Sequence, residues 1–202
     1  MKESGEFPED FQDCVRFHGH LCPGLAIGYA AVKAGIGVLE VSRSEDEEIV
    51  AIVENDSCAV DAVQVLLGCT FGKGNLVFRD WGKQVFTFFE RRTGRAVRVS
   101  LKDQALPDSE QRRALKRKID SGKASPSDKK RYDKIRRSAI QGLIQADPAD
   151  HFEITRVEAE MPPEASIVST RPCDICREST VVTRLQEKDG QMVCLGCLNR
   201  DS

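Results

Sequence analysis

Apolar residues recur along the chain with a period that changes from helical to extended and back. Residues 8–18 place their apolar side chains at helical spacing, and a longer apolar stretch follows Pro23 to about residue 39. Because proline is favoured in the first turn of a helix, Pro23 predicts the start of a second helix. Gly19 and Pro23 interrupt the helical pattern, so the two helices are expected to meet in a corner.

An extended pattern comes next. Residues 49–55 (IVAIVEN) form a short apolar run typical of a buried strand, and residues 56–68 (DSCAVDAVQVLLG) follow as a helix that ends at Gly68. Further strands are predicted near 76–79, 84–90, 95–101 and 151–160. Strands and helices in this order predict an α+β fold in which helices pack on a mixed or antiparallel sheet.

Charge is distributed unevenly, although the 202-residue chain has a formal net charge of only −2. Residues 1–60 contain 12 acidic and 4 basic residues, whereas residues 108–137 contain 12 basic and 5 acidic residues. The basic segment predicts two charged helices with a break at residues 121–126. It suits either a nucleic-acid surface or a solvated helix pair between two modules. Because only Tyr132 could stack on nucleotides, we favour the helix pair and expect no nucleic-acid partner.

Targeting signals are not evident in this sequence. The N-terminal MKESGEFPED lacks the apolar core of a secretory signal peptide. The least polar stretch, residues 24–39, is too short to span a bilayer and contains Lys33. We therefore expect a cytoplasmic protein without membrane contact. In that compartment, eight cysteines indicate metal or thiol chemistry rather than disulfides.

Four cysteines near the C-terminus form two Cys-x2-Cys knuckles that are separated by 17 residues: Cys173, Cys176, Cys194 and Cys197. Paired knuckles at this spacing predict a small zinc ribbon, in which four thiolates surround one zinc ion. The residues between the knuckles predict two strands joined by a turn at Asp189-Gly190. A pair of redox-active dithiols is the alternative, but the spacing favours zinc. With every ligand position filled by cysteine, the zinc is expected to be structural.

A second group of potential ligands lies in the N-terminal part of the chain. His18, His20 and Cys22 share the corner between the first two predicted helices, and Cys58 lies in the first turn of a later helix. Both cysteines are therefore expected at helix N-termini, where free N–H groups and the helix dipole lower a thiol pKa. Thiolate and imidazole suit zinc and softer metals, and three such ligands leave a position for a substrate. Alternatively, each cysteine is an ordinary core residue.

The motifs FHGHLCPGLAIG (17–28) and ENDSCAVDAVQVLLGCTFGKGNL (54–76), together with the four-cysteine ribbon, resemble the FmdE (or FwdE) family of formylmethanofuran dehydrogenase proteins. The resemblance extends over nearly the whole chain. It implies an α+β core related to the catalytic-domain fold of glyceraldehyde-3-phosphate dehydrogenases, often with a C-terminal zinc ribbon, and a dimer. The family takes its name from the molybdenum or tungsten enzyme that reduces carbon dioxide to formylmethanofuran.

If the two motifs form a metal- or thiol-dependent site, its residues have separate roles. Cys22 and Cys58 would be thiolate ligands or nucleophiles, and His18 or His20 would be a ligand or proton carrier. Asp61 and Lys73 carry the family pattern as supporting polar groups. We therefore expect a second metal, or a metal-containing cofactor, in a protein that serves molybdenum or tungsten redox enzymes. The alternative is a non-enzymatic module that docks on another protein through its ribbon and basic helices.

These patterns divide the chain into three parts: an α+β core (1–105), a charged helical spacer with a returning strand (106–167) and the zinc ribbon (168–202). A homodimer is expected from the resemblance and from a row of small residues on the second helix. This row consists of Gly24, Gly28, Ala31 and Gly35. Such a smooth face allows close packing, but it could equally pack inside one protomer.

Overall fold

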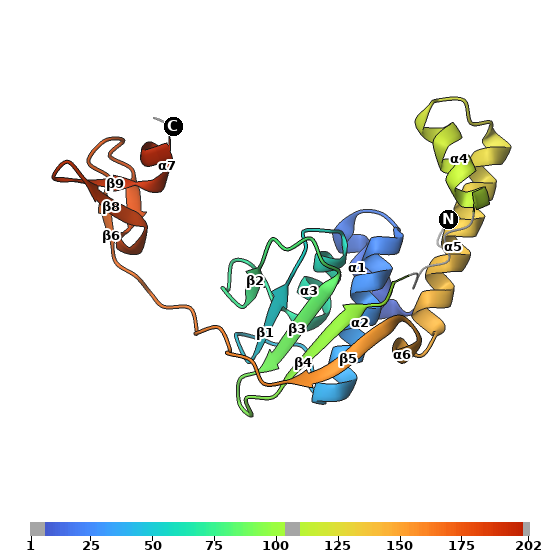
Figure 1. Cartoon of the computed structure of the whole chain (residues 1–202), viewed down its shortest axis with the longest axis horizontal. Coiled ribbons are helices and arrows are strands. Elements are labelled where there is room, and N and C mark those ends of the chain that lie inside the picture. Colours follow the sequence, from blue (N-terminus) through green and yellow to red (C-terminus); the bar gives the residue numbers. More distant parts are fainter. Residues whose placement is uncertain (1–6, 104–109, 200–202) are drawn as a thin grey trace. The chain divides into compact units, whose positions relative to one another are not determined.

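The computed structural model describes residues 7–103 and 110–199. The chain forms two compact units, residues 1–164 and residues 165–202 (Figure 1). The first residues of the expected spacer, 106–109, lie outside the described part. No helix in the described ranges is long and apolar enough to cross a membrane.

The larger unit contains a five-stranded sheet with the strand order β2-β1-β3-β4-β5. Its strands are β1 (Ile49–Val53), β2 (Leu76–Phe78), β3 (Val85–Glu90), β4 (Ala96–Leu101) and β5 (Phe152–Val157). β1 and β2 are parallel, whereas the other neighbouring pairs are antiparallel. The predicted α+β class with a mixed sheet is therefore confirmed. The returning strand is β5, which forms one edge of this sheet.

Helices pack on one face of the sheet (Figure 1). The helices of this unit are α1 (Glu9–His18), α2 (Pro23–Leu39), α3 (Ala59–Leu67), α4 (Glu110–Asp120), α5 (Pro126–Gln145) and α6 (Pro148–His151). The main core lies between α1, α2, α3, the second half of α5 and alternate strand residues such as Ala51, Phe88 and Val97. This alternation follows from the two-residue period of strand side chains.

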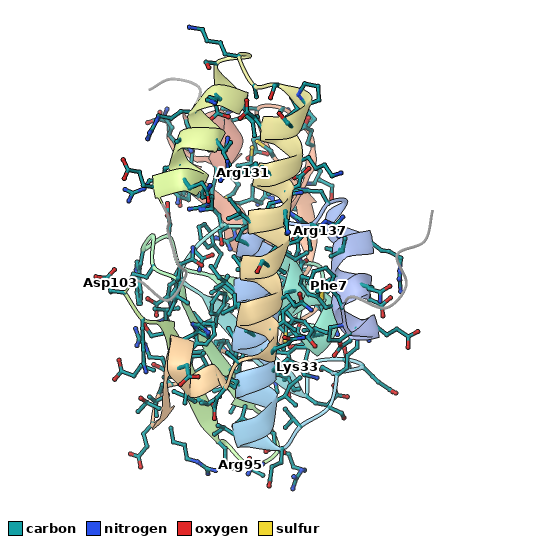
Figure 2. All side chains as sticks on the ribbon, turned by 90° about the vertical axis from the view of Figure 1, so that its right-hand side faces the viewer. Phe7, Lys33, Arg95, Asp103, Arg131 and Arg137 are labelled. Carbon is teal, nitrogen blue, oxygen red and sulfur yellow. The ribbon has the colours of Figure 1, made fainter. Side chains whose placement is uncertain are left out.

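The two charged helices belong to the larger unit and are not a free-standing linker. The predicted break is present: α4 ends at Asp120, and Ser125 caps α5 in a capping box with Asp128. In Figure 2, α5 lies in front of α2 and runs along it, with Arg131 and Arg137 labelled on α5. Ile140 and Leu143 attach the second half of α5 to the main core.

The smaller unit is a pair of hairpins around a thin core. β6 (Thr170–Pro172) pairs with β7 (Ser179–Val181), and after the 3₁₀ turn η1 (Val182–Arg184), β8 (Leu185–Lys188) pairs with β9 (Gln191–Cys194). The short helix α7 (Leu195–Leu198) follows. The turn predicted at Asp189-Gly190 is confirmed, since both residues have positive φ angles of 53° and 77°. The buried core consists of Cys173, Leu185, Val193 and Cys197.

The small-residue face of α2 is occupied within the protomer. A Cβ atom on Gly28 would lie 2.6 Å from the Cα of Ala59 and would overlap its carbonyl oxygen, so α2 can contact α3 only at a glycine. A Cβ on Gly35 would overlap the ring of Phe88 in β3, with Cδ2 as the nearest atom and Cε2 2.8 Å away. This face therefore offers no support for the homodimer, which stays a prediction.

Replacing Gly28 with alanine should destabilise the protein by about 1–3 kcal/mol, because the new methyl group overlaps backbone that cannot rotate away. Gly37 in the same helix is the matched control: it is exposed, and nothing lies within 4 Å of its Cβ position. Gly37→Ala should be stabilising by about 0.5–1 kcal/mol through helix propensity. Denaturant unfolding of both variants measures the difference. Equal effects of the two substitutions would contradict the close approach of α2 and α3.

Candidate functional site

The HGHLC segment forms a tight corner between α1 and α2. α1 ends because Gly19 adopts a left-handed conformation (φ 89°), and its N–H donates to the carbonyl of Val15 at 2.9 Å. The chain then reaches Cys22, whose Sγ caps α2 by accepting the N–H of Leu25 at 3.4 Å. As a result, ligand atoms of His18, His20 and Cys22 lie within 4.8 Å of one another.

His18 is held in one orientation by a carboxylate from another helix. Its Nδ1 lies 2.7 Å from Oδ2 of Asp61 in the first turn of α3, and the other oxygen of Asp61 accepts a hydrogen bond from Gln64 at 3.1 Å. A carboxylate at Nδ1 favours a proton on that nitrogen and leaves a lone pair on Nε2. The Nε2 atom lies 3.7 Å from the sulfur of Cys22. The His18 side chain is only 11% exposed, whereas its partner Asp61 is 30% exposed.

Cys58 reaches the same corner from the start of α3. The Sγ atoms of Cys58 and Cys22 lie 3.8 and 3.9 Å from the position that a Cβ on Gly24 would occupy. Glycine at position 24 therefore leaves the space in which the two thiols meet. The structure thus brings together His18, His20, Cys22 and Asp61, with Cys58 next to Cys22 but outside the group of ligand atoms that lie within 4.8 Å of one another.

The expected lowering of the thiol pKa is wrong for Cys22. Burial raises the pKa of Cys22, the N–H of Leu25 opposes that rise, and the neighbouring Cys58 thiol adds to it. One capping N–H is too weak to compensate for the lost solvation of a thiolate in this corner. The sequence showed the helix N-terminus, but it could not show how deeply the sulfur is buried.

Lys73 lies apart from this group. Its ammonium donates to the backbone carbonyls of Glu45 and Asp46 at 3.2 and 2.7 Å. It follows Gly68, where α3 ends, whereas Cys58 and Asp61 are at the start of that helix. Lys73 thus stabilises a loop in the structure and does not line the corner. Gln64, which supports Asp61, belongs to the second motif of the family resemblance, and its i+3 spacing from Asp61 on the predicted helix indicates this contact.

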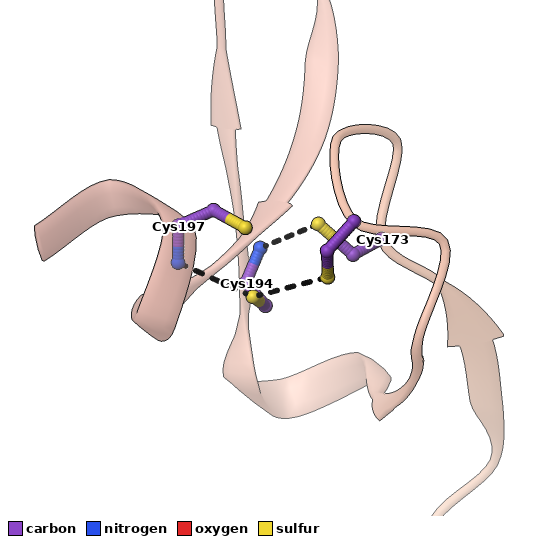
Figure 3. A group of neighbouring side chains, drawn as sticks. Cys173, Cys194 and Cys197 are labelled. Carbon is purple, nitrogen blue, oxygen red and sulfur yellow. Dashed lines mark hydrogen bonds between the residues drawn. The ribbon is translucent and has the colours of Figure 1, made fainter. Parts of the chain in front are cut away.

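A second cysteine group is present in the smaller unit (Figure 3). All four of its sulfur atoms lie within 4.8 Å of one another: those of Cys173, Cys176, Cys194 and Cys197. The sulfurs of Cys176 and Cys194 are 3.9 Å apart. The edge of a ZnS₄ tetrahedron with Zn–S bonds of about 2.3 Å is about 3.8 Å. The group can therefore hold one metal ion with little rearrangement.

Backbone N–H groups in the ribbon favour thiolates. The N–H of Cys194 donates to the sulfur of Cys173 at 3.3 Å, and the N–H of Cys197 donates to that of Cys194 at 3.4 Å. The N–H groups of Cys194 and Cys176 lower the pKa of Cys173 to about 6. Since thiolate is the ligating form of cysteine, these hydrogen bonds prepare Cys173 as a ligand, whereas the N–H of Glu178 is outweighed by desolvation and the neighbouring thiols, which raise the pKa of Cys176 to about 12.

Comparison with known families agrees with this geometry. Residues 17–153 match a family model described as "FmdE, Molybdenum formylmethanofuran dehydrogenase operon". The chain belongs to the FmdE family. The matched segment begins one residue before His18 and ends in β5, so it contains the whole Cys/His corner and the basic helices.

Two similar proteins extend the comparison of this FmdE-family chain. A probable S-adenosyl-L-methionine-binding protein from Archaeoglobus fulgidus is 32% identical over 189 residues, which are 90% of this chain and 50% of that protein. The chain thus spans about half the length of this curated relative. The crystal structure of a tungsten formylmethanofuran dehydrogenase FmdE-like protein from Syntrophus aciditrophicus has a TM-score of 0.61 at 24% identity. It covers 94% of this chain and 92% of that chain, which confirms the fold.

The four core cysteines should differ sharply in reactivity. Cys14 and Cys69 are fully buried, and burial raises the pKa of each to about 12. Iodoacetamide should therefore leave both unmodified in the native, metal-free protein, while the partly exposed Cys22 and Cys58 react. Peptide mass spectrometry measures the modification at each position, and unfolding in guanidinium should make all eight cysteines reactive. Native alkylation of Cys14 as fast as that of Cys58 would contradict this arrangement.

Proposed function

We propose that this FmdE-family protein binds a metal ion, or a metal-containing cofactor, in the corner between α1, α2 and α3. The observation that carries the proposal is the connected series from Asp61 through His18 to Cys22. Histidines that ligate metals characteristically donate their second ring N–H to a carboxylate, which fixes the tautomer and strengthens the ligand. If His18 had only a structural role, its bond to the carboxylate at Nδ1 would be sufficient. It would not need the Cys22 thiol beside Nε2.

The available donor atoms fit a borderline or soft metal. Nε2 of His18 and the sulfurs of Cys22 and Cys58 would be the ligands, with His20 as an additional one. Imidazole and thiolate together suit zinc and softer ions better than magnesium or calcium, which prefer oxygen. His20 is exposed, so this side of the corner is open to solvent. An open side is what distinguishes a site that accepts a substrate from a closed structural site.

The family assignment supports a link to molybdenum or tungsten metabolism. The family description refers to the operon of molybdenum formylmethanofuran dehydrogenase. The protein would serve such redox enzymes in the cytoplasm as an accessory or subunit-like protein, and the homodimer implied by the resemblance is part of this proposal. A bound metal would supply Lewis acidity or redox chemistry, while Asp61 and His18 would orient the ligand set.

The metal of the ribbon would be zinc in a structural role. Apart from two cysteines, the buried core of the smaller unit contains only Leu185 and Val193 among its described residues. So small an apolar core supplies little stability by itself, and four thiolates that close around one zinc ion would compensate.

The second candidate is a partner-binding module without chemistry of its own. The observation in its favour is the basic α4–α5 pair, whose described residues 110–137 contain 12 basic and 4 acidic residues. An acidic surface on another protein would complement this charge. In that case the Cys/His corner would hold no metal.

Metal analysis of the purified full chain tests both candidates. The wild-type protein should contain two metal ions per chain, one in each cysteine group. Cys22→Ser/Cys58→Ser should retain one ion, as should Cys173→Ser/Cys176→Ser, and Cys14→Ala serves as a control that retains both. If Cys22→Ser/Cys58→Ser contains as much metal as the wild type, the corner binds none and the partner-binding module is favoured.

Asp61→Asn should weaken metal binding in the corner by about 10–100-fold, the usual effect of removing the carboxylate behind a ligating histidine. The ribbon should keep its metal, because its proposed ligands are four cysteines and do not include Asp61. Asp56→Asn is the matched control: it removes an exposed carboxylate two residues before Cys58 and should change the affinity little. Competition with a chromophoric chelator measures both. Equal losses in the two variants would point to a general charge effect.

A further inference from the structure

We infer that Cys22 and Cys58 form an oxidisable thiol pair, which closes into an intramolecular disulfide and thereby blocks the corner to metals. The disulfide depends only on the placement of the two cysteines. Its consequence for metal binding rests on the proposed function. The thiol pair would thus be a modification site that regulates metal binding in the corner.

The backbone already holds the two cysteines beside each other. Cys22 precedes α2 and Cys58 precedes α3, and these helices are in backbone contact where Gly28 meets Ala59. One helical turn before that contact, the Cβ of Cys58 lies 3.2 Å from the Cβ position of Gly24. Both sulfurs lie within 3.9 Å of this position, so the two thiols are neighbours in one corner, and rotation of their side chains would bring them together.

Exposure separates this pair from the other core cysteines. Cys22 and Cys58 are partly exposed, whereas Cys14 and Cys69 are fully buried. An oxidant from solvent therefore reaches the pair in the folded protein. The Nε2 atom of His18, 3.7 Å from the Cys22 sulfur, is within reach of the proton that this thiol gives up.

Hydrogen peroxide is a sufficient oxidant. The sulfur of one thiolate attacks a peroxide oxygen, the O–O bond breaks, and hydroxide leaves as a sulfenic acid forms. The second sulfur then attacks the sulfenic sulfur, an S–S bond forms, and water leaves. In total, two thiols and one peroxide give one disulfide and two waters, and the protein loses two electrons and two protons.

Metal binding and the disulfide would exclude each other. A disulfide leaves neither sulfur as a thiolate, and thiolates are the ligating form of cysteine. Conversely, a metal bound to both sulfurs would occupy the electron pairs that attack the peroxide. The corner would therefore bind its metal in the reduced state and lose it on oxidation.

The test is non-reducing peptide mapping of the full-length protein. Before mapping, the protein is freed of any metal in the Cys/His corner and treated with hydrogen peroxide. Trypsin together with Asp-N protease separates the two cysteines from all others, in peptides 17–33 and 56–60. These two peptides should appear joined, and dithiothreitol should separate them. The link should be lost in Cys22→Ser and in Cys58→Ser, whereas the control Cys14→Ala should keep it. Gly24→Ala places a methyl group at the position that lies within 3.9 Å of both sulfurs. This variant should form the link between the two peptides more slowly than the wild-type protein.

The outcomes separate this inference from the proposed function. If peptides 17–33 and 56–60 stay unlinked while either cysteine becomes overoxidised, the thiol pair is overturned. Zinc added before the peroxide should suppress the link in the wild-type protein. A link that forms equally well with and without zinc would uphold the thiol pair but overturn its coupling to a metal, and it would count against the metal site itself.

Discussion

The candidate site depends on the backbone contact between α2 and α3. Gly28 has no side chain, so the axis of α2 approaches Ala59 more closely than any other residue would permit. Ala59 directly follows Cys58, and Gly24 lies one turn before Gly28, so this single contact sets the distance between the two thiols. It also places Asp61 opposite the end of α1, where His18 is found. A shift of α3 relative to α1 and α2 would therefore change the spacing of the carboxylate, the imidazole and both sulfurs together.

The two cysteine groups are built on opposite principles. In the core, a large apolar interior positions the helices, and the Cys/His corner lies at their ends with one histidine exposed. In the ribbon, the cysteines are themselves half of the buried core, and short hairpins supply little else. The corner is therefore formed by packing that needs no metal, whereas the ribbon would depend on its metal for stability. This difference is the physical basis for assigning an open site to one and a structural site to the other.

The charged helices contribute to the apolar core, although their amino-acid composition does not indicate it. The basic residues lie along α4 and the first half of α5, while Ile140 and Leu143 in the second half of α5 are buried in the main core. Phe152 then begins β5, which completes the sheet beside β4. A segment with the composition of a solvated spacer thus contributes both a core-packing helix and an edge strand.

The sequence by itself determined those features that arise from neighbouring residues. Pro23 begins α2, Asp189-Gly190 makes a turn, and the spacing of the knuckles puts four sulfurs within reach of one ion, because each depends on a few adjacent backbone angles. The partnership of Asp61 with His18, 43 residues away, depended on the crossing of three helices. Only the tertiary structure removed Lys73 from the corner and raised the pKa of Cys22, because both outcomes follow from burial and long-range contact. Local spacing encodes which groups a segment offers, whereas packing decides which of them meet and how much water they keep.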